Sequence, residues 1–164
     1  GIVVNAGETR TEIERVGGEG VDARALEIDV RDGASMSLVT IQQEGDVALA
    51  HRKVRLGQGA TFRQFVVAGG AQYARIETEI EVAGSGAKVE LNGVYLVAKG
   101  RHADLTSQVI MQADHAEVRQ IVFARVMARV SRRVTLQVFR HLHALSLRFH
   151  LARRTGGVAG SEKP

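Results

Sequence analysis

The sequence predicts an all-β fold of the parallel β-solenoid type, and three observations support that class. Apolar and polar residues alternate along several segments, glycine-containing turns recur at a fixed spacing, and the apolar residues are aliphatic rather than aromatic. Aromatic residues make up 4% of the 164 residues, Trp is absent, and the one Pro, beside 18 Gly, is the last residue. Stacked rungs with a core of Val, Ile, Leu and Ala have this composition.

Alternation with a period of two is clearest between residues 75 and 82. It predicts a strand with one apolar face (Ile76, Ile80, Val82) and one acidic face (Glu77, Glu79, Glu81). Leu26, Ile28 and Val30 alternate in the same way with Glu27, Asp29 and Arg31, and Val89, Leu91 and Tyr95 share a face across Gly93. Further strand-like runs cover residues 36–42, 47–56, 61–67, 103–111 and 117–123.

The turns recur as near-copies. They are Asp32-Gly33-Ala34, Gln58-Gly59-Ala60 and Ser85-Gly86-Ala87, whose alanines lie 26 and 27 residues apart. A fixed period of this length, with strands on both sides of each turn, favours one solenoid coil per repeat. The alternative is an antiparallel sandwich or jelly roll with accidental Gly-Ala turns.

Charge divides the chain into two parts. Residues 124–164 contain eight Arg, one Lys, one Glu and no Asp, which gives this stretch a charge of +8, whereas residues 1–123 carry −4. We therefore expect a partial β-helix core domain over 1–123 and a basic tail over 124–164 that is either helical or disordered. The tail shows helical spacing at Val122, Phe123, Val126, Met127 and Val130 but strand-like alternation from Leu145 to Leu151.

Several candidate sites fail a chemical test. Ser85-Gly86-Ala87-Lys88 lacks the Gly before Lys and the hydroxyl after it that a phosphate loop needs, so a β-turn with positive φ is expected. The acidic face of residues 77–81 could bind a hard cation, but solvent-exposed charge pairing, which also discourages edge pairing, is the preferred interpretation. The absence of Cys excludes disulfides and thiolate sites.

The histidines give no clear site. His102 and Asp104 should share a strand face near Ser107, where a structural hydrogen bond is favoured over a catalytic triad. His141 and His143 could chelate a metal from a strand, but no third ligand is evident. No catalytic or cofactor-binding residue is assigned, and metal ligands stay unknown.

Residues 91–120 resemble the SufB/SufD family of iron–sulfur cluster assembly proteins, and SufD most. The resemblance lies in Leu91-Asn92-Gly93-Val94-Tyr95-Leu96, Arg101-His102-Ala103-Asp104 and His115-Ala116-Glu117-Val118-Arg119-Gln120, and extends loosely back to Arg10. It implies a right-handed parallel β-helix and a non-catalytic, cytoplasmic scaffold. It also implies a SufB-like partner held through the β-helix, a SufC-like ATPase bound through a region missing here, and an iron–sulfur cluster on the full complex rather than on this fragment.

The departures from the family concern the C-terminal part. Ala116 stands where the family often has Cys, Val118 where it often has Ser, and a Gly-x-Ala-Arg-x-x-Phe-x-Gly motif is missing after Gln120. Charge, periodicity and resemblance change together near residues 123–128, which suggests a frameshift, the alternative being a divergent end or a capping helix. The chain, which begins with Gly1, is expected to be a piece of a longer or processed protein that self-associates through an open rung edge.

Two other functions are considered. A β-solenoid can carry a carbohydrate-active enzyme, which would need clustered acids and aromatic platforms that are sparse here. The basic tail could bind nucleic acid, which would give a steep salt dependence. Neither nucleic acid nor a membrane is expected as a partner, and no stretch has the length of a transmembrane helix.

Overall fold

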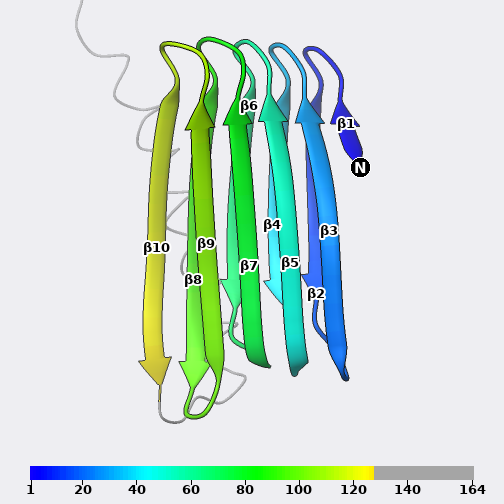
Figure 1. The fold of residues 1–164 in the computed structure, drawn as a ribbon, viewed down its shortest axis with the longest axis vertical. Helices are drawn as coiled ribbons and strands as arrows, with labels where there is room; N and C mark the ends of the chain where they lie inside the picture. The colour runs from blue at the N-terminus through cyan, green and yellow to red at the C-terminus, as the bar shows by residue number, and fades with distance from the viewer. Residues whose placement is uncertain (128–164) are drawn as a thin grey trace, which may run out of the picture. The chain divides into compact units, whose positions relative to one another are not determined.

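The computed structural model describes residues 1–127, with side chains to residue 122, and every regular element in this part is a β-strand (Figure 1). The even-numbered strands are β2 (Thr9–Val16), β4 (Ser35–Gln42), β6 (Thr61–Ala68), β8 (Lys88–Ala98) and β10 (Glu117–Met127). The odd-numbered strands are β1 (Ile2–Val4), β3 (Val21–Val30), β5 (Gly45–Leu56), β7 (Ala71–Val82) and β9 (His102–Met111).

The strands form two parallel sheets that the chain enters alternately. The odd strands make one sheet in the order β1-β3-β5-β7-β9, and the even strands make the other in the order β10-β8-β6-β4-β2. Each coil therefore adds one strand to each sheet, as the stacked arrows of Figure 1 show. This is the parallel β-solenoid that the sequence predicts, and its strand order excludes the antiparallel sandwich.

Residues of alternate parity point between the sheets and form the core. Ile76, Ile80 and Val82 are at most 1% exposed, so the apolar face predicted for β7 is the buried one. The larger of two core clusters is aliphatic except for Met36 and Phe62. Equivalent residues of successive coils stack in register, for example Ile28, Val54 and Ile80. The low aromatic content thus reflects a narrow space between two sheets.

The recurring turns, one in each coil, align in a column along one edge of the solenoid. Gly7, Gly33, Gly59 and Gly86 occupy equivalent places and have φ between 62° and 72°, a region that glycine enters without steric cost. The backbone N–H of Gly33 donates to the carbonyl of Gln58 at 2.8 Å, and that of Gly59 to Ser85 at 2.9 Å. The period of 26 to 27 residues is therefore the length of one coil.

Two boundaries differ from the sequence expectation. β10 continues to Met127, so the helical spacing read at Val122, Phe123, Val126 and Met127 is wrong for these residues. Pairing with β8 in an unbroken register from Glu117 to Met127 outweighs the local pattern. β2 was not predicted, because the side chains that it turns inward include Arg10, Glu12 and Glu14.

Candidate functional site

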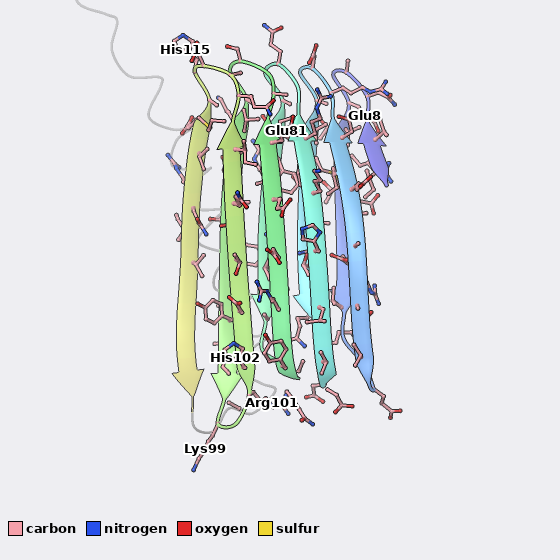
Figure 2. The ribbon with its side chains drawn as sticks, viewed as in Figure 1. Glu8, Glu81, Lys99, Arg101, His102 and His115 are labelled. Atoms are coloured by element: carbon pink, nitrogen blue, oxygen red, sulfur yellow. The ribbon has the colours of Figure 1, made fainter. Side chains whose placement is uncertain are left out.

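The outer side of the odd-numbered sheet carries rows of charged side chains, and we call it the charged face (Figure 2). Its rows alternate in sign across neighbouring strands. Lys53 of β5 stands in register between Glu27 of β3 and Glu79 of β7. One row further, Arg55 stands between Asp29 and Glu81 in the same way. Oppositely charged residues directly across a strand pair attract each other, so these rows support the register.

Each of the three glutamates of β7 lies near a basic side chain. Glu77 Oε2 is 3.7 Å from Arg75 Nη2, Glu79 Oε1 is 3.5 Å from His51 Nε2, and Glu81 Oε1 is 3.7 Å from Arg55 Nε. This is the solvent-face pairing that the sequence favoured. Its second expected role is wrong, since β7 pairs with both β5 and β9 and so has no free edge to protect.

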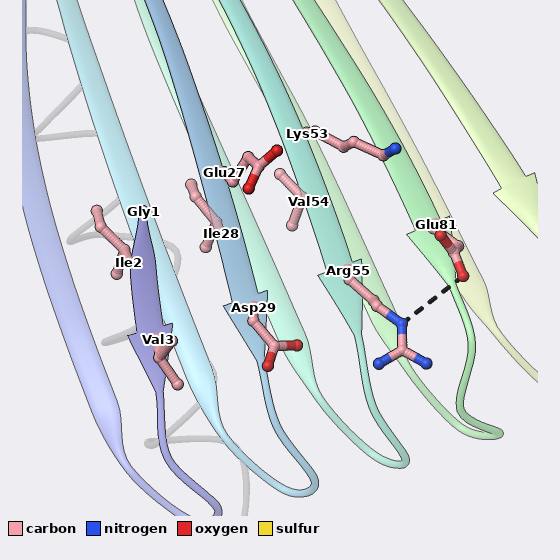
Figure 3. A pocket seen from close by; sticks show the side chains of 10 residues that line it. All are labelled: Gly1, Ile2, Val3, Glu27, Ile28, Asp29, Lys53, Val54, Arg55 and Glu81. Atoms are coloured by element: carbon pink, nitrogen blue, oxygen red, sulfur yellow. Dashed lines mark ion pairs between the residues drawn. The ribbon is translucent and has the colours of Figure 1, made fainter.

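A shallow hollow of about 460 Å³ lies on the charged face beside β1 (Figure 3). Glu27, Asp29, Lys53, Arg55 and Glu81 contribute its charged side chains. The carboxylate of Glu27 and the ammonium of Lys53 have no ion-pair or hydrogen-bond partner within residues 1–122. The hollow thus presents both signs of charge, but its open form gives no ligand a closed set of contacts.

The residues considered for a triad do not come together. His102 and Asp104 share the outer face, as expected, but no hydrogen bond links them in the described part of the chain. His102 stacks on Tyr73 with ring centroids 5.2 Å apart, and Asp104 accepts a hydrogen bond from the hydroxyl of Thr106 at 3.2 Å. Ser107 has the opposite parity and accepts a hydrogen bond from Gln120 at 2.9 Å. No nucleophile and base are paired here.

Two turn motifs have structural explanations. Ser85-Gly86-Ala87-Lys88 is a turn with φ of 72° at Gly86, in agreement with the sequence interpretation. His115 occupies the place of the glycines in the next turn with φ of 59°, and it is the one non-glycine residue with positive φ among those described. His141, His143 and the tail arginines from Arg129 onward lie outside the described residues. Within residues 1–127 no cluster of three metal-binding side chains exists.

A buried polar cluster inside the solenoid was not anticipated. Arg52 of β5 is fully buried, and its Nη2 donates to Glu14 Oε2 at 2.5 Å and to Thr40 Oγ1 at 2.9 Å. Its Nε and Nη1 have no partner among the described residues. Next to it, Thr78 donates to Gln64 Oε1 at 3.0 Å. The sequence contained a signal for this burial. In the run from Val47 to Leu56, Arg52 alternates in phase with Val54 and Leu56 and so belongs to the inward-facing side of the strand.

One carboxyl group has a shifted pKa. The side chain of Arg24 donates to Asp22 Oδ1 at 2.9 Å, and the backbone N–H of Gly17 donates to its Oδ2 at 2.8 Å. These two hydrogen bonds lower the pKa of Asp22 below its ordinary value of 3.8, and the hydrogen bond from Arg24 has the larger effect. Asp22 thereby ties the start of β3 to the turn that follows β2.

The geometry defines a class of protein: a β-solenoid core with a charge-paired outer face and without a paired nucleophile and base in its described part. The chain belongs to the SufB/SufD family, because the family model for the SUF system FeS cluster assembly, SufBD core domain, matches residues 1–135. The match continues 12 residues beyond Phe123, where the sequence placed the domain boundary.

Shorter similarities concern a different class. The chain is 54% identical over 43 residues to human "ATP-binding cassette sub-family B member 6" and 58% identical over 41 residues to the "ATM1-type heavy metal exporter" of Novosphingobium aromaticivorans. It is 50% identical over 42 residues to the "Iron-sulfur clusters transporter ATM1, mitochondrial" of Kluyveromyces lactis. These matches cover 25–26% of the chain but only 5–7% of each transporter. No solved structure shows significant similarity to the chain.

The described residues contain no helix that is long and apolar enough to cross a membrane.

Proposed function

We propose that the chain is the front part of a SufD-like scaffold subunit of the SUF machinery for iron–sulfur cluster assembly. The observation that carries this proposal is the family match over residues 1–135, which includes every strand of the solenoid. The structure is compatible with a scaffold role, because an extended sheet face with paired charges suits protein contact and residues 1–122 assemble no reacting pair of side chains.

The proposed partners are a SufB-like paralogue, held through the β-helix, and a SufC-like ATPase. The cluster is the cargo of the complex, and we propose no resident cofactor for this chain. The proposed compartment is the cytoplasm.

The proposal is tested by co-expression with the SufB-like and SufC-like proteins of the same genome, each carrying a different affinity tag. We expect the chain to co-purify with the SufB-like protein. Retention of the chain by the ATPase alone, or failure to bind a SufB-like protein that binds the full-length homologue, would contradict the proposal. Co-expression with a tagged SufD-like protein in place of the SufB-like one then separates the two paralogues, with weaker retention expected.

A carbohydrate-active enzyme is the alternative on the same fold. Polysaccharide lyases release an unsaturated product that absorbs in the near ultraviolet, so acidic polysaccharides incubated with the purified chain provide the assay. We expect no change in absorbance. A rate above background that disappears when the charges lining the hollow beside β1 are neutralised would replace the scaffold proposal with an enzyme.

The transporter similarity raises a separate question about the C-terminal stretch. We infer that the matches, which are 41 to 43 residues long, fall mainly on residues 124–164, because this 41-residue stretch has nearly that length and a different composition from the solenoid. An out-of-frame translation has no reason to be half identical to natural proteins. A match on this stretch therefore argues against the frameshift and for a junction between two coding sequences, one like the SufBD core and one like a transporter of iron–sulfur clusters or heavy metals.

Sequencing the coding DNA and its transcript across codon 123 distinguishes these origins. An uninterrupted frame that runs from the codons of the solenoid into the transporter-like codons would support the junction. A second frame that restores the Gly-x-Ala-Arg-x-x-Phe-x-Gly motif would establish the frameshift and exclude the junction.

A further inference from the structure

The outer side of the even-numbered sheet differs in chemistry from the charged face. Outward residues of successive strands form two neighbouring apolar rows that run across the sheet, and we call them the apolar stripe. Its members are Ile13, Val39, Phe65 and Ile121 in one row, which Asn92 of β8 interrupts between Phe65 and Ile121, and Ile41, Val67 and Val94 in the other. Ile13 and Ile121 are 58% and 47% exposed, Val94 is 9% exposed, and the other four are half-buried.

These side chains do not belong to the core. Their neighbours along each strand, such as Leu38, Thr40 and Val66, are fully or almost fully buried between the sheets, so the stripe residues point away from the solenoid. A sheet face that meets only water usually carries polar residues at these positions, as the charged face does. Apolar rows in register across the sheet therefore indicate a surface that contacts another protein element.

The dimensions of the apolar stripe suit a single helix. Five strands spaced by ~4.8 Å make a stripe about 19 Å long, and two rows separated by ~6.6 Å make it about 13 Å wide with side chains included. An α-helix is about 10 Å across and rises 1.5 Å per residue, so roughly 13 residues would cover this length. The area, about 250 Å², is far below the ~800 Å² per partner of a stable protein dimer, which argues against a second copy as the occupant.

The charges around the stripe indicate the chemistry of that helix. Arg15 ends the second row on β2, and Arg63 and Arg119 border the first row together with Glu90. Arg63 Nε is 3.4 Å from Glu90 Oε2 and Arg119 Nη2 is 3.8 Å from Glu117 Oε1, whereas the guanidinium of Arg15 has no partner within residues 1–122. The unpaired cation of Arg15 beside the second row favours a partner with carboxylates beside its apolar residues.

We propose that the apolar stripe binds an amphipathic helix of a partner protein, with carboxylates flanking the apolar side of that helix. Phe65 lies on the central strand β6 and supplies the largest side chain of the stripe, so it is the expected anchor. Arg15 is expected to pair with a carboxylate of the helix. This inference does not depend on the role in cluster assembly.

The probe is a fluorescent 16-residue helical peptide with Leu along one side and Glu on both flanks, and its binding to the full chain is measured by fluorescence anisotropy. Two control peptides have the same composition in scrambled order or Lys in place of Glu. We expect the ordered Glu peptide to bind at least about tenfold more tightly than either control. Equal binding of the ordered and scrambled peptides would overturn the proposal.

Variants locate the site. Phe65→Ser should weaken binding at least about tenfold, whereas Leu49→Ser, the matched change on the charged face, should leave it unchanged. Arg15→Glu, an exposed substitution that spares the fold, should shift the preference toward the Lys peptide. Equal losses in Phe65→Ser and Leu49→Ser, or no shift in Arg15→Glu, would refute the assignment. Concentration-dependent dimerisation that Phe65→Ser abolishes would assign the stripe to a second copy instead.

Discussion

Arg52 places a permanent positive charge in an aliphatic core. The stability of the fold therefore depends on the one carboxylate that pairs with this charge. Glu14 is the acid that contacts it, and its side chain is 16% exposed. Removal of one partner from a buried pair leaves an uncompensated charge, which costs about 3–5 kcal/mol when burial is complete. We expect Glu14→Gln to lower the free energy of unfolding by about 3 kcal/mol, measured by urea denaturation.

The matched control is Glu12→Gln, two residues earlier on β2. Glu12 also points inward, but its pair with Arg10 is more than one-third exposed on both sides, so a loss of at most about 0.5 kcal/mol is expected. The double variant Glu14→Gln with Arg52→Met should regain most of the loss, because an apolar side chain replaces a buried pair at little cost. Similar losses in the two single variants would contradict this account of Arg52.

His115 has a backbone conformation that its neighbours in the column leave to glycine. A residue with a Cβ in the left-handed region carries a steric penalty of roughly 1 kcal/mol. We therefore expect His115→Gly to raise the stability or leave it unchanged, while Gly86→Ala at the equivalent place of the preceding turn lowers it. A clear loss of thermal stability in His115→Gly would show that the imidazole itself makes a stabilising contact.

The lowered pKa of Asp22 should make the stability of the fold weakly dependent on pH in the acidic range. Its pKa is lower in the folded chain than in the unfolded one, so its contribution is present above the unfolded value near 3.8 and disappears as the pH falls through the folded value. Because the side chain of Arg24, the main partner of Asp22, is 46% exposed, solvent screening keeps the effect small. The stability of Asp22→Asn should converge with that of the parent as the pH falls below 3.8 and through the lower folded value. A constant difference from pH 7 to pH 2 would contradict this role.

At the scale of the element, β7 tests whether its acidic row is a cation site or a row of ion pairs. The triple variant Glu77→Gln, Glu79→Gln and Glu81→Gln should cost only about 1 kcal/mol, since exposed pairs contribute little each. Added Ca²⁺ should leave the melting temperature of the parent unchanged, because each carboxylate already faces a basic side chain. A rise in melting temperature with Ca²⁺ that the triple variant loses would restore the cation-site hypothesis.

The elements show which parts of the fold are readable from sequence. Strands with apolar residues on their inner side, such as β4, β6 and β7, follow from alternation alone, and the turn column follows from the recurring glycines. β2 and the end of β10 cannot be read from alternation. β2 turns charged groups inward, and the end of β10 is a strand because it pairs with β8. The ion pairs of β7 could be anticipated from sequence, because the alternation of its residues already places the three glutamates on the outer face. The contact between Glu14 and Arg52, 38 residues apart, required the three-dimensional register.

At the scale of the whole molecule, the coil made by β9 and β10 is the weak point. Each of these two strands has a neighbour on one side only in the described part of the chain. Inward-facing Met111, Val118 and Val122 are 51%, 42% and 39% exposed, whereas the counterparts of Met111 and Val118 one coil earlier, Val82 and Val89, are at most 1% exposed. Backbone groups at an open edge and apolar side chains behind it together form a template for association.

We therefore expect the purified chain to self-associate through this coil, so that its weight-average sedimentation coefficient rises with concentration. Val118→Lys with Val122→Lys should reduce the association, because a charge on the inner side opposes stacking of another coil. Val21→Lys, at a residue that is 68% exposed on β3, is the control and should have no effect. A monodisperse monomer at all concentrations would show that the last coil is already covered. Association through β9 and β10 predicts that only lysines in that coil have an effect. An effect of Val21→Lys equal to that of the double variant would therefore indicate general charge repulsion.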